Sequence, residues 1–457
     1  MESTDYISSY VERARKAQEL FESWDQKRID AAVRIIGRVV YENAAELAEM
    51  AVTETGMGNV PDKTLKNMGK PSIIWSSLRG KKSHGIIRRD ETAGIVEIAK
   101  PVGVIAAVTP CTNPVVTPMC NAMFALKGGN AIIFTPHHRS LHTSTRTVKM
   151  INDALAELGA PENLIQILGE QSRENTRELM ASSDVVIATG GMGMVRAAYS
   201  SGKPAFGVGA GNVQCIIDRG VDIAETVPKI ITGRSFDNGI ICSSEQTVIV
   251  QTDDHDAVME EFRKNGCYIA EAGAETDALR KVVFPEGKMN PDLVGQPASK
   301  AAAMAGVTGA EDAKILLIKA EGPGQVDLLS KEKMCPVLSV YEYNDFDDAI
   351  SIAAANLGYE GAGHSVAIHS DNVKNIETAA LRLNVSRFVV NQTSSTSAGG
   401  SFFNGFTPTT TLGCGSWGNN SISENLSYKH LINVSRIGYF MADNNVPDET
   451  ELWEEEE

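Results

Sequence analysis

The strongest constraint on the fold of this chain is an alternation of short apolar strands with helical segments. The first apolar runs lie at residues 102–108, 131–135, 164–168 and 185–189. Helical patterns at 114–126 and 144–158 connect the first three of these runs. Strands that alternate with helices form parallel sheets, because each crossover helix returns the chain to the same end of the sheet. A second alternation runs from Val213 to about Asn391. The sequence therefore predicts an α/β fold with two parallel-sheet domains that meet near Asn212.

Other segments of the chain stand outside this alternation. Helical spacing of apolar residues predicts a helix at 10–21 and another from about 30 to 55. Residues 85–99 read as two strands around a polar turn, and residues 431–437 alternate between apolar and polar side chains. These strands have little core of their own, so we expect them to pair with other strands, including strands of another subunit.

Composition excludes several classes of protein. The net charge of −16 argues against a nucleic-acid-binding protein, which would present a basic face. No apolar run approaches the roughly 18 residues that predict a membrane span, and the N-terminus has no signal-peptide pattern. The seven cysteines are widely spaced and include no Cys-x-x-Cys pair. They indicate reduced thiols in the cytoplasm and predict neither disulfides nor a metal site.

Cys242 is the strongest candidate for a catalytic residue. It lies in the string SFDNGIICSSEQ, residues 235–246, where a glycine and small side chains surround the thiol. A β-branched run at 247–250 follows. A thiol on such a loop can be approached from several sides, as a covalent catalyst requires.

Asn113 is a second candidate, in the string TPCTNP at residues 109–114. This loop follows the first buried strand, and its two prolines fix its course. In one interpretation Asn113 is a turn residue that bonds its own backbone. In the other it donates its side-chain amide to a developing oxyanion, where one donor is worth about 3–4 kcal/mol.

Two strand ends carry candidates for binding a nucleotide. Thr189, Gly190 and Gly191 follow the strand at 185–189, and glycines there let backbone N–H groups approach a pyrophosphate. The Gly-x-Gly-x-x-Gly pattern is incomplete because position 196 is an arginine, so an ordinary tight turn stays open as the alternative.

The second strand end is Thr135, followed by His137, His138 and Arg139. No carboxylate lies in this string, so a guanidinium and two imidazoles are free to meet a phosphate. The alternative interpretation is a solvated basic cluster.

Together these strings resemble the aldehyde dehydrogenase superfamily and, within it, the CoA-acylating branch. The similarity extends from about residue 10 to residue 440. The strings that carry it are residues 112–119, 197–202, 235–246, 331–336, 361–370, 394–405 and 409–426.

The resemblance implies an aldehyde dehydrogenase-like fold with three parts. A Rossmann-like cofactor-binding domain spans 1–212 and includes an oligomerisation hairpin at 85–99. A catalytic domain spans 213–408, and a C-terminal return and oligomerisation segment spans 409–457. Members of the family use such segments between subunits, so we expect a homodimer or a dimer of dimers.

The resemblance also assigns roles to residues. Cys242 becomes the nucleophile and Asn113 the oxyanion donor. Glu332, otherwise a plain surface glutamate, is expected to bond the ribose of the nicotinamide. Hydrolytic members place a water-activating glutamate about 35 residues before the nucleophile. Here Gly207 stands in that place, so a thioester on Cys242 is expected to pass to CoA instead of to water.

The cofactor is expected to be NADP or NAD. The turn at 189–191 and Gly209 are predicted to face it. Many relatives carry a lysine before Pro136 and an acid soon after, both reaching the adenosine ribose. Here Thr135 and His138 occupy those positions. Because no carboxylate is present to repel a ribose 2′-phosphate, the pattern favours NADP.

Four residues are candidates for holding the substrate. Arg234, eight residues before Cys242, could pair with a distal carboxylate or sulfonate, with Arg387 as a second choice. Ser243 and Ser397 offer hydroxyls. His364 lies in a Gly-x-Gly-His string that recurs in the acylating branch. It is either structural or placed near the thioester.

Within the branch, the chain is most similar to enzymes that act on succinate semialdehyde. The expected reaction is a reversible, NAD(P)-dependent interconversion of succinate semialdehyde and succinyl-CoA. Sulfoacetaldehyde or a short-chain aldehyde is the alternative substrate. An inactive nucleotide-binding or scaffold protein is the alternative of another class, and the presence of Cys242, Asn113 and Glu332 argues against it.

Overall fold

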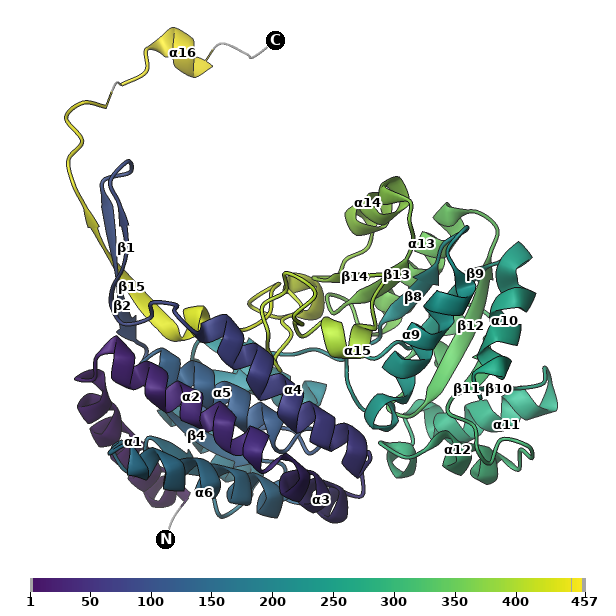
Figure 1. The fold of residues 1–457 in the computed structure, drawn as a ribbon, viewed down its shortest axis with the longest axis horizontal. Helices are drawn as coiled ribbons and strands as arrows, with labels where there is room; N and C mark the ends of the chain where they lie inside the picture. Colours follow the sequence, from purple (N-terminus) through teal and green to yellow (C-terminus); the bar gives the residue numbers. More distant parts are fainter. Residues whose placement is uncertain (1–2, 445, 454–457) are drawn as a thin grey trace.

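The computed structural model describes residues 3–444 and 446–453, so the last part of the expected C-terminal segment, 454–457, lies outside the described residues. The predicted α/β fold is confirmed. Two all-parallel sheets form the body of the molecule, and a small antiparallel sheet projects from one side (Figure 1). No helix of the described chain is long and apolar enough to cross a membrane.

The N-terminal half is built on a five-stranded parallel sheet with the order β5-β4-β3-β6-β7. Its strands are β3 (Val104–Thr109), β4 (Ala131–Pro136), β5 (Ile165–Ile167), β6 (Val185–Ala188) and β7 (Ala205–Gly207). The crossover helices are α5 (Val116–Lys127), α6 (Leu141–Glu157), α7 (Arg173–Ser182) and α8 (Met192–Tyr199). Every residue of β3, β4 and α5 is buried, which explains their nearly continuous apolar sequence.

Four helices precede this sheet: α1 (Ser3–Glu22), α2 (Gln26–Glu42), α3 (Ala44–Thr55) and α4 (Val60–Leu78). α1 packs against the sheet itself, whereas α2, α3 and α4 pack on α5, α6 and one another. The prediction of one helix over 30–55 was wrong, since the chain breaks at Asn43. The Asn43 side chain donates to the Val39 carbonyl (2.8 Å) and ends α2 there. Helix α4, whose interior contains Pro71, was not predicted from the sequence.

The second parallel sheet has seven strands in the order β10-β11-β12-β9-β8-β13-β14. They are β8 (Gln214–Ile217), β9 (Thr247–Gln251), β10 (Tyr268–Ile269), β11 (Leu316–Lys319), β12 (Val337–Tyr343), β13 (Val366–His369) and β14 (Phe388–Val390). Its helices are α9 (Ile223–Ser235), α10 (His255–Lys264), α11 (Ala274–Val283), α12 (Ala298–Ala305), α13 (Phe346–Tyr359), α14 (Val373–Arg382) and α15 (Ser394–Ser397). The chain passes from the five-stranded sheet to the seven-stranded sheet between β7 and β8.

The antiparallel sheet joins distant parts of the chain. β1 (Gly85–Asp90) and β2 (Ile95–Pro101) form the expected hairpin, with Gly85 opposite Ala99. β15 (Ile432–Gly438) pairs with the other edge of β2, and Ile432 lies opposite Pro101. The short helix α16 (Glu449–Trp453) follows beyond this sheet (Figure 1).

Residues that lead into β15 pack on the N-terminal core. Leu426, Tyr428 and Leu431 belong to the same hydrophobic cluster as β3, β4 and α5. The Leu431 carbonyl accepts a hydrogen bond from the buried Asn130 side chain (2.8 Å). The chain thus returns from the second sheet to complete the core of the first.

Candidate active site

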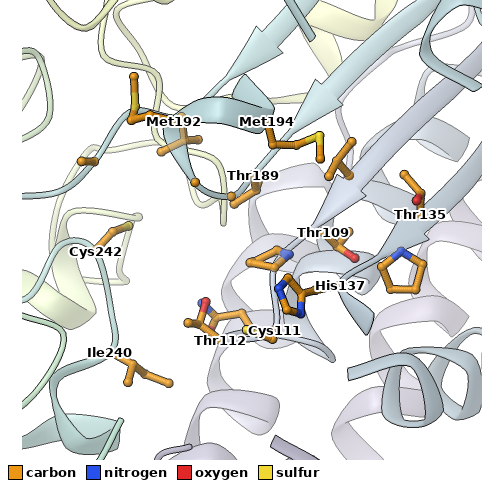
Figure 2. Close-up of a pocket in the computed structure, with 18 of the residues that line it drawn as sticks. Thr109, Cys111, Thr112, Thr135, His137, Thr189, Met192, Met194, Ile240 and Cys242 are labelled. Carbon is orange, nitrogen blue, oxygen red and sulfur yellow. The ribbon is translucent and has the colours of Figure 1, made fainter. Parts of the chain in front are cut away.

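A cavity of about 710 Å³ lies at the carboxyl ends of the strands of the five-stranded sheet. Its walls include Thr109 at the end of β3, Thr135 near the end of β4 and Thr189 after β6 (Figure 2). This is the edge of a parallel sheet where ligands bind. Loops of the second half, carrying Cys242 and Glu332, close the other side.

Cys242 and Asn113 line this same cavity. Cys242 lies on the loop before β9, and the residue as a whole is half-buried. Close packing places this loop, because a Cβ on Gly211 would stand 1.9 Å from the Cys242 carbonyl oxygen. Only glycine at position 211 permits that approach.

The electrostatic environment of Cys242 keeps its thiol protonated. Desolvation raises the pKa of Cys242 to about 12, and the nearby Glu332 carboxyl acts in the same direction. The Arg387 guanidinium opposes this rise and is the cation that favours the thiolate. Arg387 is itself buried, and it donates to the carbonyls of His364 (2.7 Å) and Gly413 (2.8 Å).

The predicted cofactor residues, with one exception, line the cavity: Thr135, His137, His138, Thr189, Gly190, Gly191, Gly209 and Glu332. A Cβ atom built on Gly190 or Gly191 would have no described atom within 4 Å. The backbone of both glycines therefore faces open space, as the binding of a phosphate requires. The His137 and His138 rings stack at 4.3 Å.

Arg139 is the exception. Its guanidinium donates to the Thr55 carbonyl (3.2 Å) at the end of α3, and it is not among the residues that line the cavity. Arg173, at the start of α7, is a lining cation that the sequence analysis missed. Arg173 is exposed, and it lies three positions after Glu170 in a stretch with no recognisable motif, so the sequence gave no reason to single it out.

Carboxylates are scarce in this cavity. Among its described lining residues only Glu332 carries one. Burial and the neighbouring Glu360 carboxyl raise the pKa of Glu332 to about 8. Within the described chain, no group of three or more His, Cys, Asp or Glu side chains is arranged to hold a metal ion.

The structure does not bring the four substrate-binding candidates into the cavity lining. Arg234 is fully buried, and its guanidinium donates to the carbonyls of Lys333 and Cys335 and to the Ser244 hydroxyl (3.3 Å). These internal bonds and the burial of Arg234 hold it away from the cavity lining, so the structure does not bring it to the place where a substrate anion would bind.

The other three candidates are also buried. The Ser243 hydroxyl donates to the Ser395 carbonyl (3.3 Å). The Ser397 carbonyl accepts from Asn404 (3.0 Å) in the loop after α15. His364 is fully buried, and burial together with Arg387 lowers its pKa to about 3, so its ring is neutral.

Lys70 on α4 is a candidate that the sequence analysis missed. Its ammonium donates to the carbonyls of Gly399 (3.1 Å) and Thr409 (3.4 Å), and no described carboxylate forms an ion pair with it. Desolvation lowers the pKa of Lys70 to about 8, whereas interaction with the Cys120 and Cys242 thiols opposes that shift. Lys70 is therefore a cation without a described carboxylate partner, although it does not itself line the cavity. Lysines at 63, 66 and 70, spaced for one helical face, were the signal available in the sequence.

Comparisons with known proteins agree with this geometry. The aldehyde dehydrogenase family model matches residues 2–274 and 317–431. A succinate-semialdehyde dehydrogenase (acetylating) of Clostridium kluyveri is 52% identical over 98% of both chains. An acylating sulfoacetaldehyde dehydrogenase of Bilophila wadsworthia is 41% identical over 98% of this chain and 97% of its own.

Solved structures show the same likeness. An acetylating aldehyde dehydrogenase from Geobacillus thermoglucosidasius is 36% identical, with a TM-score of 0.93 over 98% of this chain and 99% of its own. A propionaldehyde dehydrogenase from Rhodopseudomonas palustris, solved with bound CoA and an acylated cysteine, is 29% identical, with a TM-score of 0.83 over 95% of this chain and 97% of its own. The chain described here belongs to the aldehyde dehydrogenase family.

Proposed function

We propose that this chain is a CoA-acylating aldehyde dehydrogenase that interconverts an aldehyde and its acyl-CoA. One observation carries the proposal. Cys242 and Asn113 line one cavity, while the position of the hydrolytic glutamate is taken by Gly207, which has no side chain and does not line that cavity. A nucleophile and an oxyanion donor are present without a dedicated base for water.

The residues present supply the nucleophile and the oxyanion donor of the reaction. The Cys242 thiol gives up its proton to water as its sulfur attacks the aldehyde carbonyl, and the Asn113 amide donates to the oxygen that becomes negative. A nicotinamide cofactor, when bound, would supply the acceptor for the hydride of the former aldehyde carbon, so that an acyl thioester remains on Cys242. The CoA thiol then attacks the thioester carbon, and its proton returns to the Cys242 sulfur as that sulfur leaves. One thioester replaces another, so the reaction runs in both directions.

We propose NADP or NAD as the cofactor, with a preference for NADP. His137, His138 and Arg173 line the cavity near β4 and α7, and the single lining carboxylate, Glu332, belongs to the loops of the second half of the chain. Imidazole and guanidinium groups pair favourably with a ribose 2′-phosphate, and no carboxylate of the lining stands among them to repel it.

We propose succinate semialdehyde and succinyl-CoA as the substrate pair. Two features support this choice: the 52% identity to a succinate-semialdehyde dehydrogenase, and Lys70, a lysine outside the cavity lining whose electrostatic interactions include the Cys242 thiol. A distal carboxylate buried without a partner would be costly, and a lysine offsets that cost. The relative that acts on sulfoacetaldehyde favours a sulfonate as the second candidate, since the same cation suits both anions.

We also infer a homodimer or a dimer of dimers that works in the cytoplasm. The β1-β2-β15 sheet projects from the body and carries the exposed Ile86 and Ile437, and the exposed Tyr439 follows directly after β15. These apolar side chains suit contact with a second copy. A reactive thiol and the CoA thiol both require a reducing compartment.

The proposal is tested by assaying the purified enzyme with NADPH and NADH against succinyl-CoA and acetyl-CoA. In the reverse direction, succinate semialdehyde and sulfoacetaldehyde are supplied with and without CoA, and the products are identified by mass spectrometry. The expected result is fastest NADPH oxidation with succinyl-CoA, and acyl-CoA as the oxidation product. Steady formation of free acid without CoA would overturn the acylating mechanism. Best activity on sulfoacetaldehyde would overturn only the substrate.

A further inference from the structure

We infer that Lys66 is a positioning residue that fixes the Asn113 amide with its N–H donors toward the nucleophile. The inference rests on the proposed role of Asn113 as the oxyanion donor. In this role Lys66, on a helix outside the reaction centre, determines which end of the Asn113 amide faces the substrate.

The first observation is the contact between the two side chains. The Lys66 ammonium donates to Asn113 Oδ1 at 2.7 Å. An ammonium has only donors, so the atom that faces it must be the amide oxygen. The Asn113 nitrogen is then turned away from Lys66. Its described partner is the Thr112 hydroxyl at 3.4 Å, a long bond that leaves this donor available to a ligand.

The second observation is the anchor that holds Lys66 in place. Asp237 is completely buried, and its Oδ2 accepts from both Lys66 (2.5 Å) and Lys63 (3.0 Å). Its Oδ1 accepts from the backbone N–H of Asn59 (3.2 Å). Lys63 and Lys66 are buried as well. Because Asp237 and both lysines are buried, little water competes for the bonds among them, and the geometry is narrowly defined.

The third observation is where the anchor lies in the chain. Asp237 stands five residues before Cys242, on a segment where Asp237 and Asn238 have positive φ angles of 52° and 54°. The lysines come from α4 in the N-terminal half. One carboxylate on the nucleophile's own segment thus connects, through Lys66, to the oxyanion donor on the loop after β3.

Two consequences for the reaction follow. Without Lys66 the amide can turn over about its terminal torsion, which has two nearly equivalent wells, and present oxygen to the developing oxyanion. A positive charge on the amide oxygen also polarises the group and strengthens donation by its nitrogen. Both effects act on the transition state, so a loss of Lys66 lowers kcat and leaves KM nearly unchanged.

The test is a double-mutant cycle of Lys66→Met and Asn113→Ala in the full-length enzyme, with kcat and KM for acyl-CoA reduction as the readout. Asn113→Ala is expected to lower kcat about 100-fold or more, as does loss of one oxyanion donor elsewhere. Lys66→Met is expected to lower kcat about 10-fold or more in the native background and less than about threefold when Asn113 is already alanine. Lys66→Arg, also only a donor, is expected to restore most of the lost rate.

Lys63→Met is the matched control. Lys63 shares the helix face and the Asp237 carboxylate, but its further contact is the Thr112 carbonyl (3.4 Å) and not the Asn113 side chain. Its effect on kcat is expected to be smaller than that of Lys66→Met and to be the same with or without Asn113. If Lys66→Met does not fold, Lys66→Gln enters the same cycle, because glutamine is neutral and can present either donor or acceptor.

The possible failures are distinguishable. Equal losses from the Lys66 variants with and without Asn113 would overturn the inference and leave the oxyanion assignment standing. A fully active Asn113→Ala enzyme would overturn that assignment and the inference with it. A rise in KM with constant kcat would show that Lys66 contributes to binding and does not position the amide.

Discussion

The backbone N–H of Gly207 donates to the Tyr199 hydroxyl at 2.8 Å, and the Tyr199 ring fills the space beside Gly207. A Cβ on residue 207 would stand 3.0 Å from Tyr199 Cε2 and 2.6 Å from Val195 Cγ1. Position 207, which our proposal equates with the place of the hydrolytic glutamate, is therefore closed by packing from α8.

We predict that Gly207→Glu does not convert the enzyme into a hydrolase. The new side chain overpacks against Tyr199 and Val195, which costs about 1–3 kcal/mol of folding stability. The measurements are the melting temperature and the yield of free acid without CoA. The double variant Gly207→Glu/Tyr199→Ala, which makes room, should recover much of the lost stability. Fast free-acid formation by the single variant would contradict the prediction.

Cys242→Ala should abolish both aldehyde oxidation and acyl-CoA reduction, because no other group forms the thioester. The expected loss in kcat is several powers of ten, while binding of NADPH, followed by its fluorescence, stays close to that of the native enzyme. Cys111→Ala is the matched control, since Cys111 lines the same cavity. Activity of Cys242→Ala above about one hundredth of the native value would refute the nucleophile.

Lys70→Met should separate the two acyl-CoA substrates. Removing the cation leaves a distal carboxylate unpaired, and a hydrogen bond to a charged group is worth about 1.5–3 kcal/mol, or at least tenfold in KM for succinyl-CoA. KM for acetyl-CoA, which has no distal anion, should change by less than about twofold. Lys70→Arg keeps the charge and serves as control. Equal effects on both substrates would assign Lys70 to structure alone.

Arg234→Met should destabilise the fold without changing the choice of substrate. The guanidinium donates to the Lys333 and Cys335 carbonyls. The Cys335 carbonyl also accepts from the Val337 N–H (2.7 Å), but the buried Lys333 carbonyl loses its described donor, which costs about 1–3 kcal/mol. Thermal unfolding and the ratio of kcat/KM for succinyl-CoA and acetyl-CoA measure the two effects. A selective loss of succinyl-CoA activity at unchanged stability would restore Arg234 as a substrate residue.

Glu245→Gln should alter how stability depends on pH. Burial raises the pKa of Glu245 from 4.5 to about 8, although Ser394 N–H donates to it and Arg234 lies nearby. The fold therefore favours the protonated Glu245 carboxyl. The contribution of this carboxyl to the free energy of unfolding is lost as pH rises from about 4.5 toward 8. Glutamine does not titrate, so the melting temperature of the variant minus that of the native enzyme should increase between pH 5 and about pH 9. A constant difference would show that Glu245 does not titrate in this range.

Periodicity and turn chemistry predicted the parallel sheets and the strand ends at the cavity, because buried strands and crossover helices leave strong local patterns. Thr135 and Thr189 were found in this way, whereas Cys242 was found from its glycine-bearing loop and from the resemblance of its string to the family. The N-terminal helices were predicted less well. Asn43 ends α2 through a side-chain bond, and Pro71 inside α4 obscured that helix.

The side-chain environments around the site could not be predicted from local sequence. Arg234 precedes Cys242 by eight residues, yet α9 directs it to the Lys333 and Cys335 carbonyls about a hundred residues further along the chain. Lys66 meets Asn113 and Asp237 only after α4 packs beside both loops. Such contacts depend on the tertiary fold, which no single string of residues specifies.

The pairing of β15 with β2 has a consequence for how the protein is made. Residues 95–101 leave the ribosome early, but the strand that covers their open edge, residues 432–438, is among the last to be synthesised. Until then β2 presents unpaired backbone groups, and the core near Asn130 lacks Leu426, Tyr428 and Leu431. An unpaired strand edge is a template for aggregation. The nascent chain must therefore keep its N-terminal half unfinished, and shielded from other chains, until translation ends.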